Sequence, residues 1–221
     1  MTDLFEYLKH NAYPGRGIFA GKYNSENVIA YFIMGRSANS RNRIFVKKDD
    51  ILYTKAYDES KVADPSLIIY NAIRTYDGKT IVTNGNQTDT IYDFLKEGKT
   101  FEEALATREY EPDAPNFTPR ISALLTDEEY TISILKKKDE ECERISYTYP
   151  YSENTGHFIS TYDHDGDPLP SFSSEPIGCD ISLPFEPFAE KLWDSLNQEN
   201  KLSLYVSFGN KEKIFNKNGG D

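Results

Sequence analysis

Hydrogen-bonding side chains are concentrated in two segments that follow each other closely along the chain. Residues 70–74 have the sequence Tyr-Asn-Ala-Ile-Arg, and residues 84–90 have the sequence Asn-Gly-Asn-Gln-Thr-Asp-Thr. The pattern predicts a buried strand, a tight turn at Asp77-Gly78, a second strand, and a polar turn that opens a helix. Polar side chains at strand ends and at a helix N-terminus can converge on one cleft. We therefore expect a site for a polar, planar ligand.

A basic segment lies earlier in the chain. Between Asn11 and Lys48, seven lysines and arginines stand against one acid, Glu26, which gives a local net charge of +6 in a chain whose net charge is −11. Residues 36–43 have the sequence Arg-Ser-Ala-Asn-Ser-Arg-Asn-Arg, with three arginines among small polar residues. Arginine binds phosphate through two parallel hydrogen bonds. We favour a small anion site over the alternative, a solvated basic edge.

Two carboxylates, Glu111 and Asp113, lie in a loop that contains three prolines. A carboxylate held stiffly there could act as a general acid or base if its pKa were raised. Taken alone, the segment favours a loop carboxylate paired with Arg108 or Arg120. Asp89 is likewise most simply explained as an acid that interacts with a helix N-terminus.

The hydroxyl groups of Tyr70, Tyr162 and Thr2 need separate consideration. Tyr70 and Tyr162 could be core tyrosines whose hydroxyls are hydrogen-bonded. Removal of Met1 would expose Thr2, a potential N-terminal nucleophile. A short helix predicted over residues 3–10 separates Thr2 from the first strand, so we expect Thr2 to lie outside any cleft.

The elements that must position these residues are strands in hairpins, with helices between them. This order predicts an α+β fold rather than alternating βαβ units. We expect one domain over residues 1–221, with residues 1–12 as an N-terminal helical extension and 216–221 as a frayed tail. A capping box at Thr100 and Glu103 predicts a helix start there. The other helices are predicted over 88–96 and 185–196, and the strands over 17–23, 28–35, 43–48, 51–57, 67–74, 80–83, 121–125, 130–137, 144–149, 157–162, 202–208 and 213–215.

Composition argues against several classes of function. The net charge of −11 argues against an extended nucleic-acid surface, and no apolar run approaches the length of a membrane span. The two cysteines form no CxxC motif, and the three histidines show no metal-ligand spacing. We therefore expect a cytoplasmic protein with no metal and no organic cofactor. The chain also has no GxSxG motif, Walker loop or GxGxxG motif.

Taken as a series, short motifs in residues 13–162 resemble the archaeal-type inosine monophosphate (IMP) cyclohydrolase family. The resemblance covers about two-thirds of the chain. It departs from the family at Ala38-Asn39-Ser40, where an aromatic residue and a proline are usual. The matching pieces are Tyr13-Pro14-Gly15-Arg16, Ala20-Gly21, Arg36-Ser37, Arg41, residues 70–74, residues 84–91, Tyr110-Glu111, residues 118–121 and Ser160-Thr161-Tyr162.

The resemblance implies a four-layer αββα sandwich of mostly antiparallel sheets, as in N-terminal-nucleophile hydrolases, without use of their nucleophile. It also implies a step of de novo purine biosynthesis. In that step 5-formamidoimidazole-4-carboxamide ribonucleotide (FAICAR) loses water and closes its second ring to give IMP. The implied catalytic residues are Arg41, Tyr70 and Glu111. The implied substrate-binding residues are Arg16, Arg36, Ser37, Asn71, Asn84, Gly85, Thr88, Asp89, Thr118, Arg120 and Tyr162.

Within this set, Glu111 and Tyr70 are expected to move protons, and Arg41 to stabilise the oxyanion or tune Tyr70. Asn71, Asn84 and Asp89 are expected to orient the base and ribose. Arg16, Arg36 and Arg120 are candidates for the phosphate.

The sequence leaves three alternatives open. The chain could be a nucleotide-binding protein without turnover, an amide hydrolase that uses Thr2, or a cyclohydrolase for a related imidazole ribonucleotide. The expected partner is a small-molecule ribonucleotide. Homo-oligomer formation is open, as is a functional link to a transformylase for 5-aminoimidazole-4-carboxamide ribonucleotide (AICAR).

Overall fold

Two antiparallel sheets face each other in the computed structural model, which describes residues 1–62 and 69–219. In spatial order, the six-stranded sheet consists of β11 (Ile177–Asp180), β10 (Thr155–Ser160), β1 (Arg16–Tyr23), β2 (Glu26–Met34), β12 (Lys201–Phe208) and β13 (Lys211–Asn216). The seven-stranded sheet consists of β3 (Arg43–Lys48), β4 (Ile51–Ala56), β5 (Asn71–Tyr76), β6 (Lys79–Thr83), β7 (Arg120–Leu125), β8 (Glu129–Lys138) and β9 (Glu141–Pro150).

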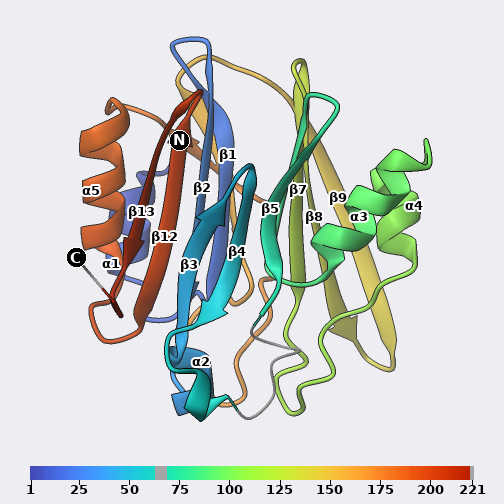
Figure 1. Cartoon of the computed structure of the whole chain (residues 1–221), viewed down its shortest axis with the longest axis vertical. Helices are drawn as coiled ribbons and strands as arrows, with labels where there is room; N and C mark the ends of the chain where they lie inside the picture. The colour runs from blue at the N-terminus through green and yellow to red at the C-terminus, as the bar shows by residue number, and fades with distance from the viewer. Residues whose placement is uncertain (63–68, 220–221) are drawn as a thin grey trace.

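Helices cover the outer face of each sheet, so the protein has four layers (Figure 1). Helices α1 (Leu4–Lys9) and α5 (Phe185–Ser195) lie on the six-stranded sheet, and α3 (Gln87–Lys96) and α4 (Phe101–Ala106) lie on the seven-stranded sheet. Two short helices, α2 (Ala38–Arg41) and the 3₁₀ helix η1 (Glu59–Lys61), lie at one end of the sandwich. None of the described helices combines the length and apolarity needed to cross a membrane.

Among the described residues, three apolar cores lie between the four layers. One lies between α1, α5 and the six-stranded sheet, where the rings of Phe5 and Phe188 are 5.4 Å apart. The second lies between the sheets and includes Ile18 and Ile132, and the third lies beneath α3 and α4. Because β2 is covered on both faces, its residues from Val28 to Met34 are all buried. A strand covered on both faces shows a continuous apolar run instead of an alternating one.

Local sequence explains the turns and helix starts that hold this frame. Asp77 and Gly78 both have positive φ, as a two-residue hairpin turn requires, and this turn was predicted. The predicted capping box is also present, because Glu103 N–H donates to Thr100 Oγ1 and Thr100 N–H donates to Glu103 Oε2.

Several boundaries differ from the prediction. The first hairpin turn is only Asn24-Ser25, both with positive φ, so β2 already begins at Glu26. Strand β9 is longer than predicted, and β11 was not predicted. The apolar residues of the predicted helices were expected to be buried; Ile91 of α3 is buried, but Phe94 and Leu95 are only partly buried, as is Trp193 of α5. Helix α2 replaces an expected loop, because Ser37 and Ser40 form a reciprocal capping box.

Two predicted segments fall partly outside the described residues. Of the strand predicted over 67–74, Leu67 and Ile68 lie outside them, and β5 begins at Asn71. Of the tail predicted over 216–221, residues 220–221 lie outside them. Asn216 is the last residue of β13, and Lys217 N–H donates to Leu202 O at 2.8 Å. Ordered structure therefore continues past residue 216.

Candidate active site

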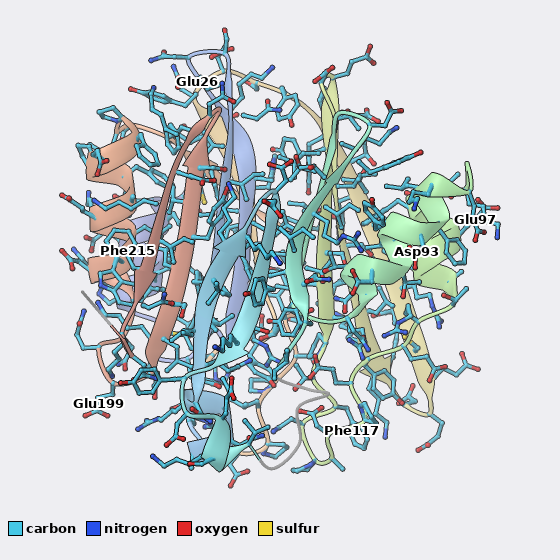
Figure 2. All side chains as sticks on the ribbon, viewed as in Figure 1. Glu26, Asp93, Glu97, Phe117, Glu199 and Phe215 are labelled. Atoms are coloured by element: carbon cyan, nitrogen blue, oxygen red, sulfur yellow. The ribbon has the colours of Figure 1, made fainter. Side chains whose placement is uncertain are left out.

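A cavity of about 300 Å³ lies at the end of the sandwich where α2 lies. The strands β1, β3 and β7 begin at this end, and β2 and β10 finish there. Phe117, in the loop between α4 and β7, lies at the same end, whereas Glu26 marks the opposite end (Figure 2). The lining residues are Tyr13, Arg16, Arg36, Ser37, Asn39, Ser40, Arg43, Glu111, Asp113, Asn116, Thr118, Tyr162 and Leu169.

A larger hollow of about 690 Å³ lies at the opposite end, among the hairpin tips. Its charged lining includes Lys47 and Glu212, which form an ion pair at the surface. The smaller cavity is the better candidate, because buried groups of opposite charge converge on it. Perturbed titratable groups in a cleft are typical of functional sites.

Glu111 is the central carboxylate of the cavity and is only 3% exposed. Its Oε2 lies 3.2 Å from Arg16 Nη2, and its Oε1 lies 4.0 Å from Arg120 Nη1. Burial raises the pKa of Glu111, while Arg16 and Arg120 oppose that rise. Burial acts to lower the pKa of Arg16, but Glu111 and the neighbouring tyrosine hydroxyls together outweigh burial, and the pKa lies well above the ordinary value. A carboxylate with a raised pKa can both accept and return a proton.

A second buried guanidinium, that of Arg43, lines the cavity. Arg43 is 2% exposed, and its Nε and Nη2 donate to the backbone oxygens of Ser40 and Met34 at 2.8 and 3.1 Å. Burial and the nearby Arg16 both lower its pKa. Arg16 and Arg43 together make this end of the cavity cationic.

Arg41 is placed differently. Its Nε donates to Gly35 O at 3.1 Å and its Nη2 to Asn200 Oδ1 at 3.3 Å, and it does not line the cavity. Arg41 ends α2, whereas Arg43 begins β3 and shares its buried side with Phe45. Alternation with Phe45 was the sequence signal for an inward-facing Arg43.

Tyr70 lies behind the cavity instead of lining it. Its hydroxyl is 2.7 Å from the hydroxyl of Tyr31, and both side chains are buried between the sheets. Burial raises the pKa of Tyr70, although Arg43 and Arg16 act to lower it. Tyr70 is therefore a neutral phenol at neutral pH.

One wall of the cavity is a chain of hydrogen bonds. The Tyr162 hydroxyl lies 2.6 Å from Thr118 Oγ1, which donates to Asp113 Oδ2 at 2.5 Å. Tyr13 stacks on Tyr162 with ring centroids 6.0 Å apart. Gly15 has φ +79°, and a Cβ there would lie 2.6 Å from the Tyr162 ring. Glycine at position 15 therefore allows Tyr162 to pack closely against the backbone.

A second group of predicted residues supports Glu111 from behind. Arg120 Nη1 donates to Gln87 Oε1 at 2.9 Å, and a Cβ at Gly85 would lie 2.6 Å from that Nη1. Asn84 donates to Pro119 O and accepts from Ile121 N–H. Thr88 Oγ1 lies 2.7 Å from Thr83 Oγ1. These contacts fix the start of β7 and the orientation of Arg120, so their role here is positional.

Asn71 and Asp89 form a separate cluster. Asn71 Nδ2 donates to Asp89 Oδ1 at 2.9 Å, and Arg74 Nη1 lies 2.6 Å from the same oxygen. The Arg74 guanidinium lies over the Tyr92 ring at 3.4 Å. This cluster joins β5 to α3, and neither Asn71 nor Asp89 lines the cavity.

The structure therefore divides the predicted set into three groups. The cavity lining includes Arg16, Arg36, Ser37, Glu111, Thr118 and Tyr162. Tyr70, Asn84, Gly85, Thr88 and Arg120 lie behind it, and Arg41, Asn71 and Asp89 lie elsewhere. The lining also includes Asn39, Ser40 and Arg43 of the predicted anion segment and the loop carboxylate Asp113, together with Tyr13, Asn116 and Leu169, to which no role was assigned. Within the described ranges, no cluster of three or more His, Cys, Asp or Glu side chains could hold a metal ion.

Comparison with known proteins agrees with the resemblance seen in the motifs. A family model described as "IMP cyclohydrolase-like protein" matches residues 13–213. The IMP cyclohydrolase of Methanopyrus kandleri is 34% identical over 180 residues, which cover 72% of this chain and 89% of that protein. Those of Methanosphaera stadtmanae and Methanocella arvoryzae are 30% and 28% identical, covering 69% and 68% of this chain and 75% and 74% of theirs.

The family match extends beyond residue 162, where the recognisable motifs end, and takes in α5, β12 and the start of β13. The match therefore includes β12 and part of β13, which form one edge of the six-stranded sheet. The chain belongs to the IMP cyclohydrolase-like protein family.

Proposed function

We propose that this protein is an IMP cyclohydrolase that converts FAICAR to IMP with loss of one water molecule. The observation that carries the proposal is the buried Glu111, held between Arg16 and Arg120 at a cationic cavity, in a chain whose relatives are named IMP cyclohydrolases. The cavity volume of about 300 Å³ is at the lower end of the range for small-molecule sites.

The reaction needs positioning and proton transfer more than it needs a nucleophile from the protein. The carboxamide nitrogen attacks the formyl carbon of the same molecule and loses a proton, and the formyl oxygen becomes a hydroxyl. The hydroxyl then leaves as water while the formamide nitrogen loses its proton and forms the ring C=N bond. Holding the two groups in contact supplies much of the rate, because the attack is intramolecular. The reaction also requires a group that accepts the amide proton and a proton donor for the departing hydroxyl. It requires positive charge near the developing oxyanion as well.

The described residues can meet these requirements. Glu111, with its raised pKa, is the proposed acceptor of the carboxamide proton. Arg16 and Arg43 provide positive charge where the formyl oxygen becomes an oxyanion. Tyr70 remains protonated and lies beside the charged cluster, so its proposed part is to donate a hydrogen bond or proton from behind the cavity.

The two arginines on either side of Asn42 provide a test of the oxyanion role. Replacing Arg43 by Gln should lower kcat roughly 100-fold, because it removes a buried donor at the cavity. Replacing Arg41 by Gln should change kcat by no more than about twofold, because that side chain is exposed and bonded away from the cavity. Steady-state kinetics on both variants would show which of the two arginines stabilises the oxyanion. A larger loss in Arg41→Gln would restore Arg41 as the catalytic arginine.

The alternative of a Thr2-dependent amide hydrolase has little structural basis. Thr2 is exposed, its N–H donates to Gly178 O at 2.9 Å, and it does not line the cavity that contains Glu111. We expect Thr2→Ala, and a protein with a blocked N-terminus, to keep full FAICAR turnover. Loss of turnover in Thr2→Ala would instead indicate an N-terminal nucleophile.

The proposed activity is tested by mixing purified protein with FAICAR, without added metal, and following ring closure by ultraviolet absorbance. Conversion faster than the uncatalysed rate is the expected result. Absence of conversion, with a rise in melting temperature on addition of IMP, would identify a binding protein without turnover. Conversion of a related imidazole ribonucleotide but not FAICAR would identify a different cyclohydrolase.

Some finer features belong to the same proposal. The four layers suggest the N-terminal-nucleophile hydrolase fold, used here without its nucleophile. The core between the sheets draws on residues from Ile18 to Tyr205, which favours a single domain. We further propose a cytoplasmic enzyme that receives its substrate from an AICAR transformylase, and whose oligomeric state can be measured by light scattering.

A further inference from the structure

Arg36 differs from the other arginines in and behind the cavity, because its ion-pair partner is exposed and can be displaced. Arg16 and Arg120 share the buried Glu111, and Arg43 is bonded to two backbone oxygens. Arg36 Nη1 instead lies 2.5 Å from Asp165 Oδ1 in an ion pair whose side chains are 36% and 46% exposed. It also donates to Gly166 O at 2.9 Å. Exposed ion pairs contribute little net stability, so this contact is readily exchanged.

The loop that carries Asp165 contributes Leu169 to the lining of the cavity. Its base is fixed, because Asp163 N–H donates to Pro170 O at 3.0 Å and Leu169 N–H donates to Asn116 Oδ1 at 3.1 Å. Its tip contacts Arg36, whose guanidinium also lies 4.9 Å from the centre of the Tyr13 ring. Gly166 N–H donates to Asp165 Oδ1 at 3.1 Å, so the carboxylate keeps a partner when it releases Arg36.

A phosphate group is expected to bind Arg36 more strongly than Asp165 does. A phosphate monoester carries close to two negative charges at neutral pH and accepts two parallel hydrogen bonds from a guanidinium, whereas the Asp165 contact is a single short bond. Phosphate at Arg16 or Arg120 would instead approach the negative charge of Glu111. Among the three arginines considered for the phosphate, Arg36 is thus the one at the rim with a displaceable anion.

We propose that the ribonucleotide phosphate binds Arg36 by displacing Asp165, so that Asp165 is a competing anion which lowers affinity for phosphorylated ligands. This inference rests on the proposed function, because it takes the ligand to be a ribonucleoside monophosphate. Asp165 acts through Arg36 and is a positioning residue, not a catalytic one.

The chain offers a matched control for the loss of negative charge. Asp167 lies in the same loop and is also exposed, but it forms no ion pair with any residue in 1–62 or 69–219. Asp165→Asn and Asp167→Asn therefore make the same change in net charge, and only the first removes the contact with Arg36.

The test is calorimetric titration of the wild type, Arg36→Gln, Asp165→Asn, Asp167→Asn and the Arg36→Gln/Asp165→Asn double variant with IMP and with inosine. Arg36→Gln should weaken IMP binding about tenfold or more, because it removes charge-assisted hydrogen bonds. Asp165→Asn should strengthen IMP binding about two- to fivefold, as loss of an exposed competing ion pair implies. That gain should disappear in the double variant. The affinity for inosine should be the same in all of these proteins. Asp167→Asn should bind IMP with wild-type affinity.

Other results would overturn the inference. An equal gain in IMP affinity in Asp165→Asn and Asp167→Asn would show that the gain comes from the change in net charge and not from loss of the contact with Arg36. A gain that persists in the double variant, or weaker IMP binding by Asp165→Asn, would show that Asp165 does not compete at Arg36. Wild-type turnover of FAICAR with an unchanged preference for IMP over inosine in Arg36→Gln would overturn this inference alone. Absence of both turnover and IMP binding in the wild type would overturn the proposed function together with it.

Discussion

Replacing Glu111 by Gln should lower kcat for FAICAR closure by about 10²–10⁴-fold while IMP still binds. The amide has nearly the shape of the carboxylate but cannot accept the carboxamide proton. Binding should persist because the change removes a negative charge beside Arg16 and Arg120, which does not disfavour an anionic ligand. Stopped-flow absorbance measures the turnover, and calorimetry with IMP measures the binding and confirms that the protein is folded.

Glu109→Gln is the matched control, because Glu109 lies two residues away and its side chain is 70% exposed. It should keep wild-type turnover. The pH profile gives an independent check. Since burial raises the pKa of Glu111, the acid limb of kcat/KM in the wild type should lie above the ordinary value of about 4.3 for Glu. That limb should be absent from the residual activity of Glu111→Gln. Turnover within tenfold of wild type would exclude Glu111 as the proton acceptor.

Replacing Arg16 by Gln should destabilise the protein by about 3–5 kcal/mol at neutral pH, because it leaves a buried carboxylate without its nearest cation. The double variant Arg16→Gln/Glu111→Gln should recover most of that loss, since it leaves no unpaired charge. Both variants should be inactive. Chemical denaturation at several pH values measures the difference in the free energy of unfolding between them.

The sign of the pH dependence follows from the pKa of Glu111. Its folded-state pKa is already raised by burial, and losing Arg16 raises it further. The folded state of Arg16→Gln therefore binds this proton more tightly than the unfolded state does. The difference from the double variant should be small below the unfolded pKa of about 4.3 and should grow as pH rises through the folded pKa. Arg41→Gln, which removes an arginine outside the cavity, serves as the control. A pH-independent difference would show that Glu111 is not the source of the loss.

Much of the fold could be predicted because the turn and helix-capping residues in the sequence mark the same element boundaries that the packed structure has. The turn at Asp77-Gly78 and the capping box at Thr100 depend on backbone chemistry within a few residues, so the sequence is sufficient to identify them. Strand β11 has only four residues and no clear alternation, so its position depends on pairing with β10. Such a strand is defined by a partner distant in sequence.

The candidate site was predicted less completely, for two geometric reasons. Neighbouring strand residues point to opposite faces of a sheet, so Tyr70 enters the core between the sheets while Asn71 faces α3. A prediction that grouped both in one cleft ignored this alternation. The other reason is α2, whose single turn changes which arginine faces inward. The resemblance pointed to Arg41, whereas the alternation with Phe45 along β3, which begins directly after this turn, is the sequence signal for Arg43.

The ion pair between Arg16 and Glu111 also joins the two halves of the sandwich, because Arg16 begins β1 of one sheet and Glu111 precedes β7 of the other. Well-packed apolar residues often stabilise a protein more than a buried ion pair does. Laboratory evolution for heat resistance alone should therefore drift toward apolar residues at positions 16 and 111 and lose the enzyme. Selection for heat resistance and activity together has to keep this ion pair, so the added stability must come from substitutions elsewhere in the protein.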